Sequence, residues 1–187
     1  MPVLNGHAAQ ASWPAYSHDG VYVYFSGATT ANFGLWRANA DGSSPHLLYT
    51  DPSGLAWRSS PSPDGTRLAF TNASKAPAGV QVFTLATKTV STWEVVGHTP
   101  RWSPVGEVIA FVTPYGGSVF VMNSDGTGVR QVSPGGRTYG ETSLTWSTDA
   151  VWLVARGPTT LELINVATGA TLPLGYSTAF IEPAWKP

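Results

Sequence analysis

The chain has no cysteine and little charge. Among its 187 residues the absence of Cys excludes disulfide bonds, thiolate nucleophiles and cysteine-ligated metals. Charged residues make up only 11%, and ten Lys and Arg nearly balance eleven Asp and Glu, which leaves a formal net charge of -1. A nucleic-acid surface needs a dense field of basic side chains, and the sequence offers none. We therefore expect no nucleic-acid partner.

Long hydrophobic runs are also missing. No apolar stretch approaches the roughly 18 to 20 residues with which a helix crosses a bilayer, so we expect no membrane insertion. The first twenty residues have neither the basic segment nor the apolar segment of a signal peptide. The sequence therefore predicts no signal peptide within this chain.

Uninterrupted stretches of helical length are scarce, because 20 Gly and 15 Pro recur along the whole chain. The two long runs free of both, 80–96 and 141–156, alternate apolar and polar residues around a polar turn. Such alternation, with many β-branched residues, is typical of strands and not of amphipathic helices. We therefore expect an all-β protein.

What the sequence does contain is a repeat of about 44 residues. A turn that follows an aromatic or proline-rich segment occurs four times, and its Asp position recurs after 45, 41 and 44 residues (Asp19, Asp64, Val105 and Asp149). Each turn leads into three further short apolar segments separated by polar turns. Four strands per unit of this length is the pattern of a β-propeller blade. We predict an N-terminal extension at 1–11, blade units at 12–56, 57–97, 98–140 and 141–179, and the first strand of a fifth blade at 180–187.

Two segments of the repeat resemble a known family. Residues 62–70 (SPDGTRLAF) and 119–132 (VFVMNSDGTGVRQV) are similar to the two halves of the TolB-type, WD40-like propeller repeat. This repeat also occurs in the propeller domains of prolyl-oligopeptidase-like proteins and in some polysaccharide lyases. The resemblance covers about residues 12–187. It implies a β-propeller of four-stranded antiparallel blades and a periplasmic or extracellular location, but no single function, because the family is functionally diverse.

The number of blades departs from that family, whose members usually close a ring of six or more. Four blades and one strand leave two sheet faces without a neighbour. The chain could close as a small ring with a spare strand, complete the propeller as a homo-oligomer or with another chain, or be a fragment of a larger protein. The end of the sequence just before a fifth turn slightly favours the last two arrangements.

The motifs of catalysis and cofactor binding are absent from the sequence. It has no Gly-x-Ser-x-Gly nucleophile, phosphate loop or dinucleotide fingerprint. The four histidines share no metal-binding spacing, and turn formation explains the Asp residues that precede Gly. We therefore predict no catalytic residues, no metal and no cofactor.

The aromatic residues separate into two groups. Trp102, Trp146 and Trp185 occupy one repeat position, with Tyr16 as the equivalent in the first unit. A position that recurs in every unit usually packs between blades, so we expect these side chains in the core. Trp57 lies outside this register, after a Pro- and Gly-containing loop, and is the better candidate for exposure.

The candidate binding site is the mouth of the central channel. Residues just before the innermost strand of each blade gather there, and loops on a rigid scaffold often carry specificity. The predicted ligand-binding residues are Arg58, His98, Arg101, Tyr139, Glu141, Glu182 and Trp57. Solvated loop residues are the simpler explanation of the same pattern. The sequence favours a non-catalytic binding or scaffold module for a protein, peptide or glycan. The alternative is the propeller domain of a larger enzyme, either a prolyl-oligopeptidase-like hydrolase or a polysaccharide lyase.

Overall fold

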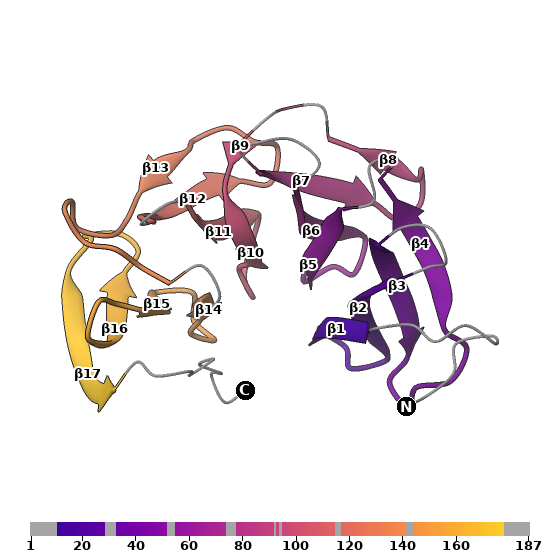
Figure 1. Cartoon of the computed structure of the whole chain (residues 1–187), viewed down its shortest axis with the longest axis horizontal. Coiled ribbons are helices and arrows are strands. Elements are labelled where there is room, and N and C mark those ends of the chain that lie inside the picture. The colour runs from indigo at the N-terminus through magenta and orange to yellow at the C-terminus, as the bar shows by residue number, and fades with distance from the viewer. Residues whose placement is uncertain are drawn as a thin grey trace.

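The computed structural model describes residues 11–28, 33–51, 55–73, 78–91, 93, 95–114, 117–140 and 144–177. These residues form seventeen strands in four antiparallel sheets that lie along an arc (Figure 1). No helix occurs in the described ranges, and so none that is long and apolar enough to cross a membrane. The predictions of an all-β chain and of propeller blades are confirmed. The predicted strand at 180–187 and most of the extension at 1–11 lie outside the described residues.

Each sheet is built from consecutive strands, with the first strand innermost in the arc (Figure 1). Sheet 1 contains β1 (Ala11–Tyr16), β2 (Tyr22–Ala28), β3 (Phe33–Asn39) and β4 (His46–Thr50). Sheet 2 contains β5 (Ala56–Pro61), β6 (Arg67–Asn72), β7 (Gly79–Thr84) and an outer strand in two pieces that both pair with β7, β8 (Thr89–Val90) and β9 (Val95–Val96). Sheet 3 contains β10 (His98–Trp102), β11 (Val108–Val112), β12 (Val119–Asn123) and β13 (Arg130–Gln131). Sheet 4 contains β14 (Leu144–Trp146), β15 (Trp152–Arg156), β16 (Thr160–Asn165) and β17 (Thr171–Ser177).

In sheets 1, 2 and 4 the turn between the first two strands is held by one Ser and one Asp, as sheet 2 illustrates. Ser62 Oγ donates to Asp64 Oδ1 (2.5 Å), and the same carboxylate oxygen accepts the Thr66 amide (3.0 Å). Gly65 follows with a φ of 68°, a conformation that glycine adopts without a steric cost. Burial works to raise the pKa of Asp64, but the hydrogen bonds from Ser62 and Thr66 and the nearby Arg67 outweigh it and lower this pKa to about 2. The repeated Ser–x–Asp–Gly sequence thus specifies the tight turn.

Consecutive sheets pack face to face through apolar clusters. Between sheets 1 and 2 the fully buried side chains include Tyr24, Leu35, Leu68, Phe70 and Phe83. Between sheets 2 and 3 they include Val80, Trp102, Ile109, Phe111 and Met122, and between sheets 3 and 4 they include Val112, Val119, Leu144, Trp146, Leu153 and Ile164. Each sheet therefore depends on its neighbours to cover its faces.

The recurring aromatic position is core in two units and surface in another. Trp102 is 5% exposed and Trp146 is 7% exposed, as expected for residues between blades. Tyr16, their equivalent, is 63% exposed, so the expectation of a core residue was wrong there. The physical reason is that this side of a strand packs on the preceding sheet, and sheet 1 begins the arc. Trp57 is half-buried, and Trp185 lies outside the described residues.

Candidate functional site on the innermost strands

The strands β1, β5, β10 and β14 lie on the inner side of the arc (Figure 1). Consecutive members of this set contact one another, β1 with β5, β5 with β10 and β10 with β14. Four of the predicted site residues, Trp57, Arg58, His98 and Arg101, lie within β5 and β10. The sequence placed them before the innermost strand, whereas the structure places them within it.

A β-bulge interrupts three of these strands at the same repeat position. The register shifts between Ser12 and Ala15, between Trp57 and Ser60, and between His98 and Arg101. One residue of each bulge has a left-handed backbone: Trp13 with φ 53°, Arg58 with φ 55° and Thr99 with φ 52°. For residues with a Cβ this conformation costs on the order of 1 to 2 kcal/mol, so some other interaction must hold it in place.

A backbone hydrogen bond to the preceding sheet supplies that interaction. The Arg58 amide donates to Ser26 Oγ (3.0 Å), and the Thr99 amide donates to Thr71 Oγ1 (3.1 Å). The strained bulge therefore joins one sheet to the next. This hydrogen bond uses the backbone amide and places no requirement on the side chain. The left-handed residues of the three bulges are accordingly of three different types, Trp13, Arg58 and Thr99.

The side chains of the three bulges meet in one group. The guanidinium carbon of Arg58 lies 5.3 Å from the centre of the Trp13 ring, and its Nη1 donates to Thr99 Oγ1 (2.7 Å). The Trp57 ring contacts Trp13 edge-on, with centroids 5.5 Å apart and planes at 70°. We call Trp13, Trp57, Arg58 and Thr99 the inner-wall cluster. Trp57 Nε1 is buried in it without a hydrogen-bond partner among the described residues.

Two members of the inner-wall cluster were not predicted from the sequence, and a signal for them exists. Trp13 and Thr99 stand three residues before Tyr16 and Trp102, as Arg58 stands three residues before Pro61. Alignment of the repeats at this offset would have placed all three at equivalent positions.

Arg101 contacts the following sheet and not the inner-wall cluster. Its Nε donates to the Leu144 carbonyl (3.0 Å), and its own carbonyl accepts the Trp146 indole N–H (2.9 Å). Arg101 therefore ties β10 to β14, which joins sheets 3 and 4. His98 is half-buried at the start of β10, opposite Val112 of β11.

Tyr139, another predicted site residue, is buried between sheets 3 and 4. It is 3% exposed and packs in the cluster between sheets 3 and 4, where its hydroxyl donates to Glu162 Oε2 (2.8 Å). Arg137 Nη1 donates to the other carboxylate oxygen of Glu162 (2.6 Å), and Glu162 is itself 4% exposed. The other two predicted residues, Glu141 and Glu182, lie outside the described residues.

Because of two tyrosines, we expect the free energy of unfolding to vary with pH in the alkaline range. Burial, then the nearby Asp51 carboxylate, raises the pKa of Tyr49 to about 12, and burial followed by the bond to Glu162 raises the pKa of Tyr139. The unfolded chain loses these protons near the ordinary pKa of about 10, before the folded chain does. Unfolding is therefore favoured increasingly as pH rises above about 10. We expect the urea midpoint to fall between pH 10 and 12, and to fall less steeply in Tyr49→Phe and Tyr139→Phe; equal slopes in all three proteins would contradict this.

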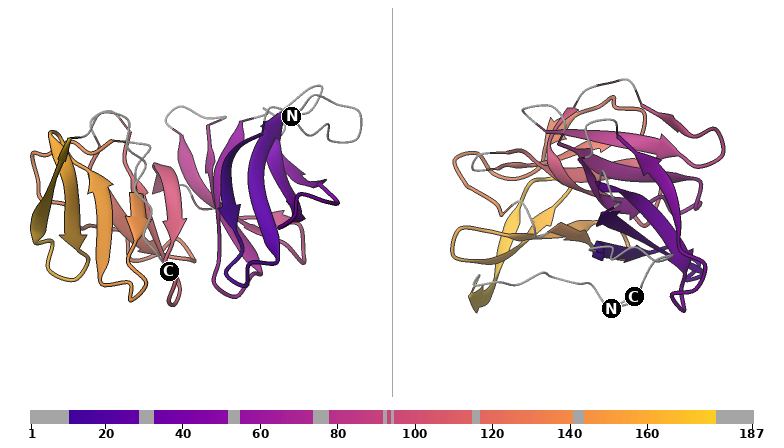
Figure 2. Two further views of the ribbon diagram at one scale, coloured as in Figure 1. Left: turned by 90° about the horizontal axis from the view of Figure 1, so that it is seen from below. Right: turned by 45° about the vertical axis from the view of Figure 1, so that its right-hand side comes forward.

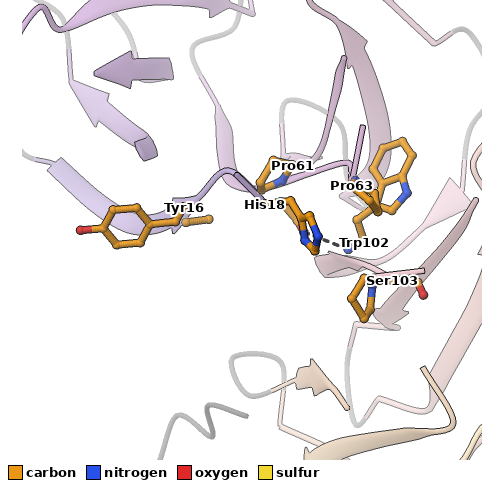
Figure 3. Close-up of a pocket in the computed structure, with 9 residues that line it drawn as sticks. Tyr16, His18, Pro61, Pro63, Trp102 and Ser103 are labelled. Atoms are coloured by element: carbon orange, nitrogen blue, oxygen red, sulfur yellow. Dashed lines mark hydrogen bonds between the residues drawn. The ribbon is translucent and has the colours of Figure 1, made fainter. Parts of the chain in front are cut away.

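A small pocket of about 220 Å³ lies at the other end of the same strands. Its lining includes Tyr16, His18, Pro61, Pro63, Trp102 and Pro104, from the ends of β1, β5 and β10 and the turns that follow. Figure 3 shows the His18 ring among Pro61, Pro63 and Trp102, whereas the Tyr16 ring points away from them. In the described part of the chain, no three His, Asp or Glu side chains come together in a group able to hold a metal ion.

Comparison with known proteins identifies the fold. No protein-family profile matches the chain. An uncharacterized protein of Agrobacterium fabrum is 30% identical over 113 residues, which are 53% of this chain and 38% of that protein. TolB from Acinetobacter baumannii is structurally similar, with a TM-score of 0.77, 15% identity, and coverage of 94% of this chain and 45% of that one. A putative TolB from Agrobacterium tumefaciens has a TM-score of 0.76 and 15% identity over 88% of this chain and 65% of that one.

These likenesses confirm a TolB-type β-propeller fold and nothing finer. The chain spans less than half the length of the Agrobacterium fabrum protein and of the Acinetobacter TolB. What those whole proteins bind or do is therefore not carried over to this chain.

Proposed function

We propose that this chain is a non-catalytic binding module that holds a peptide segment of a partner protein against its inner wall. The observation that supports this most directly is the placement of Arg58 between the Trp13 ring and the Thr99 hydroxyl on the innermost strands. The backbone at this position serves the joint between sheets, but the joint requires no particular side chain. We therefore attribute the presence of Trp13 and Arg58 at these positions to a ligand that their side chains contact.

The composition of the inner-wall cluster favours a peptide. Trp and Arg are the residue types that most often dominate binding energy at protein interfaces. Trp13, Trp57 and Arg58 are each half-buried, so part of every side chain stays accessible. The rings of Trp13 and Trp57 can cover an apolar side chain of a bound segment, and Arg58 lies over the Trp13 ring. We propose an extended peptide with an apolar residue that packs on these rings.

The rigidity of the cluster supports binding without rearrangement. The bulges fix the backbone of Arg58 and Thr99 by bonds to Ser26 and Thr71, and the ring contact fixes Trp57 on Trp13. Side chains that are already ordered lose less conformational entropy on binding. By its likeness to TolB we also propose a periplasmic or extracellular location. The propeller domain of a larger enzyme stays an untested alternative.

A displayed library of random peptides tests the proposed function. The chain should enrich peptides that share an apolar residue, and Arg58→Ala should weaken the affinity of an enriched peptide at least about tenfold, equivalent to 1.4 kcal/mol. Arg58→Lys should also weaken it, because an ammonium group cannot both lie flat over the Trp13 ring and reach the Thr99 hydroxyl. Arg130→Ala, at the outer strand β13, is the matched control and should leave affinity unchanged.

The melting temperature of each variant separates a binding defect from a folding defect. If Arg58→Lys melts like the parent chain and still binds the enriched peptide with equal affinity, the inner wall is not the peptide site. Failure to enrich any peptide, together with Arg58-dependent binding on a glycan array, would replace the peptide by a glycan.

A further inference from the structure

The small pocket beside the turns is a second recess on the strands that carry the inner-wall cluster, and we call it the turn pocket. Its lining comes from the ends of β1, β5 and β10 and from the turns that follow them. Because sheet 2 lies between sheets 1 and 3 in the arc, a recess that all three line lies along the inner edge of sheet 2 (Figure 1). The strands of the sheets run between the same two sides of the molecule (Figure 2, left). The inner-wall cluster and the turn pocket therefore follow one another along β5.

The turn pocket has the size of one ring. Its volume is about 220 Å³. This is less than the roughly 300 to 1,000 Å³ of pockets that enclose a drug-sized ligand. It is more than the volume of about 150 Å³ at which an apolar cavity holds a benzene molecule. The turn pocket therefore has room for a single aromatic side chain and not for a larger ligand.

The walls of the turn pocket are flat and mostly apolar. The His18 ring lies among Pro61, Pro63 and Trp102 (Figure 3), and Pro104 adds a third proline. Proline rings are apolar and lack the amide hydrogen, so they offer no donor to a polar ligand. Among the residues that the structure describes, no Asp, Glu, Lys or Arg side chain lines this pocket. Such walls favour a neutral, planar ring, which can stack on the rings of His18 and Trp102 or meet them edge-on.

Two polar side chains of the pocket have hydrogen-bonding capacity to spare. Ser60 is 8% exposed, and its Oγ accepts the Trp102 amide (2.9 Å). Within the described ranges its hydroxyl hydrogen has no acceptor, and the His18 ring has no hydrogen bond. A hydroxyl group on the bound ring both donates and accepts, so it can bond to either side chain. The occupant that fits both the walls and these polar groups is a phenol ring, the side chain of tyrosine.

The distance along β5 indicates which residue of a bound peptide reaches the turn pocket. Arg58 of the inner-wall cluster and Pro61 of the pocket are three positions apart on this strand, and at about 3.3 Å per residue they are separated by roughly 10 Å. An extended peptide covers this distance in about three residues. Because successive side chains of an extended chain point to opposite sides, the residue that faces the pocket lies about two to four positions from the one on the cluster.

We infer that the turn pocket binds a tyrosine side chain of the partner peptide, about two to four residues from the apolar residue that packs on the inner-wall cluster. The inference rests on the proposed function for the source of the ring, and on the pocket alone for the fit of a phenol. Two anchors on one peptide also fix its register along β5, which a single apolar contact does not.

Titration with p-cresol, the tyrosine side chain as a free molecule, tests the pocket separately from any peptide. The NMR shift of the Trp102 indole N–H should change saturably as p-cresol is added. Toluene, which lacks the hydroxyl group, should bind at least about threefold more weakly, the factor that one ordinary hydrogen bond contributes. His18→Ala should weaken the binding of p-cresol by a similar factor. Thr148→Ala is the matched control, because it changes the same turn position in sheet 4 outside the pocket and should leave binding unchanged.

Peptides enriched on the parent chain test the source of the ring. They should carry a tyrosine about two to four residues from the shared apolar residue. Replacing this tyrosine by alanine should weaken binding to the parent chain at least about tenfold, and by a smaller factor to the His18→Ala variant, which has already lost part of the contact. The melting temperature of His18→Ala should equal that of the parent, since His18 is exposed.

The outcomes separate this inference from the proposed function. If p-cresol does not bind saturably, or binds no better than toluene, the turn pocket is not a phenol site, whatever the peptides show. If p-cresol binds but the enriched peptides carry no tyrosine at this spacing, the pocket takes a free phenolic molecule, and the peptide source is wrong while the proposed function stands. If no peptide is enriched, the proposed function fails together with the peptide source, and the p-cresol titration still decides whether the pocket takes a phenol.

Discussion

Replacing Trp102 with alanine is expected to lower the free energy of unfolding by about 3 to 5 kcal/mol, the usual cost of truncating a buried aromatic side chain. Trp102 is 5% exposed between sheets 2 and 3, where it packs with Ile109 and Met122. The adjoining sheets cannot close over a cavity of this size without moving whole strands. The loss should appear in urea denaturation as a lower midpoint with an unchanged slope.

Tyr16→Ala is the matched control for Trp102→Ala, because both residues occupy the same repeat position. Tyr16 is 63% exposed, and its replacement should change the unfolding free energy by less than about 0.5 kcal/mol when measured on single chains. Similar losses at both positions would mean that burial between sheets does not determine the contribution of this aromatic residue.

Arg137→Ala is expected to lower the free energy of unfolding, because it leaves the carboxylate of Glu162 buried without its cation. Glu162 is 4% exposed between sheets 3 and 4, and in the described part of the chain the Tyr139 hydroxyl would be its remaining side-chain hydrogen-bond partner. The expected loss is below that for a fully enclosed ion pair, since 45% of the Arg137 side chain is exposed. Urea denaturation at neutral pH measures it.

Two further variants separate the charge effect from general damage at this joint. Arg130→Ala removes an exposed arginine that bonds the Val166 carbonyl (2.8 Å) across the same two sheets, and it should cost less than about 1 kcal/mol. Adding Glu162→Gln to Arg137→Ala should recover part of the lost unfolding free energy, because a neutral amide then replaces the buried, unpaired carboxylate. Sheet 2 carries Gln81 at the equivalent position. A double variant less stable than Arg137→Ala would show that the buried charge is not the cause.

The fold could be predicted from the sequence because its determinants are local. The Ser–x–Asp–Gly turn and the alternation of the strands each lie within a few residues, and both recur. The burial of Trp102 and Trp146 followed from the repeat. The exposure of Tyr16 did not, because burial depends on whether another sheet stands beside that strand.

The candidate site was only partly predictable, because its geometry arises between sheets. Arg58 was identified as a residue near the channel, but its contacts with Trp13 and Thr99 join residues that are 45 and 41 positions apart. The burial of Tyr139 against Glu162 was not predicted, because Glu162 follows no sequence pattern. The equivalent residues in the other sheets are Trp36, Gln81 and Phe120, which share no chemistry with a carboxylate.

The hydrogen bond between a bulge amide and a hydroxyl of the preceding sheet has a consequence for how such chains evolve. Thr71 gives sheet 2 the acceptor for the sheet that follows, and the bulge at Arg58 gives it the donor for the sheet that precedes. A duplicated gene segment encoding such a unit therefore carries both halves of a working joint, and inserting it leaves the older joints unchanged. Lineages can lengthen or shorten the array one unit at a time, with selection acting afresh mainly on the two terminal faces.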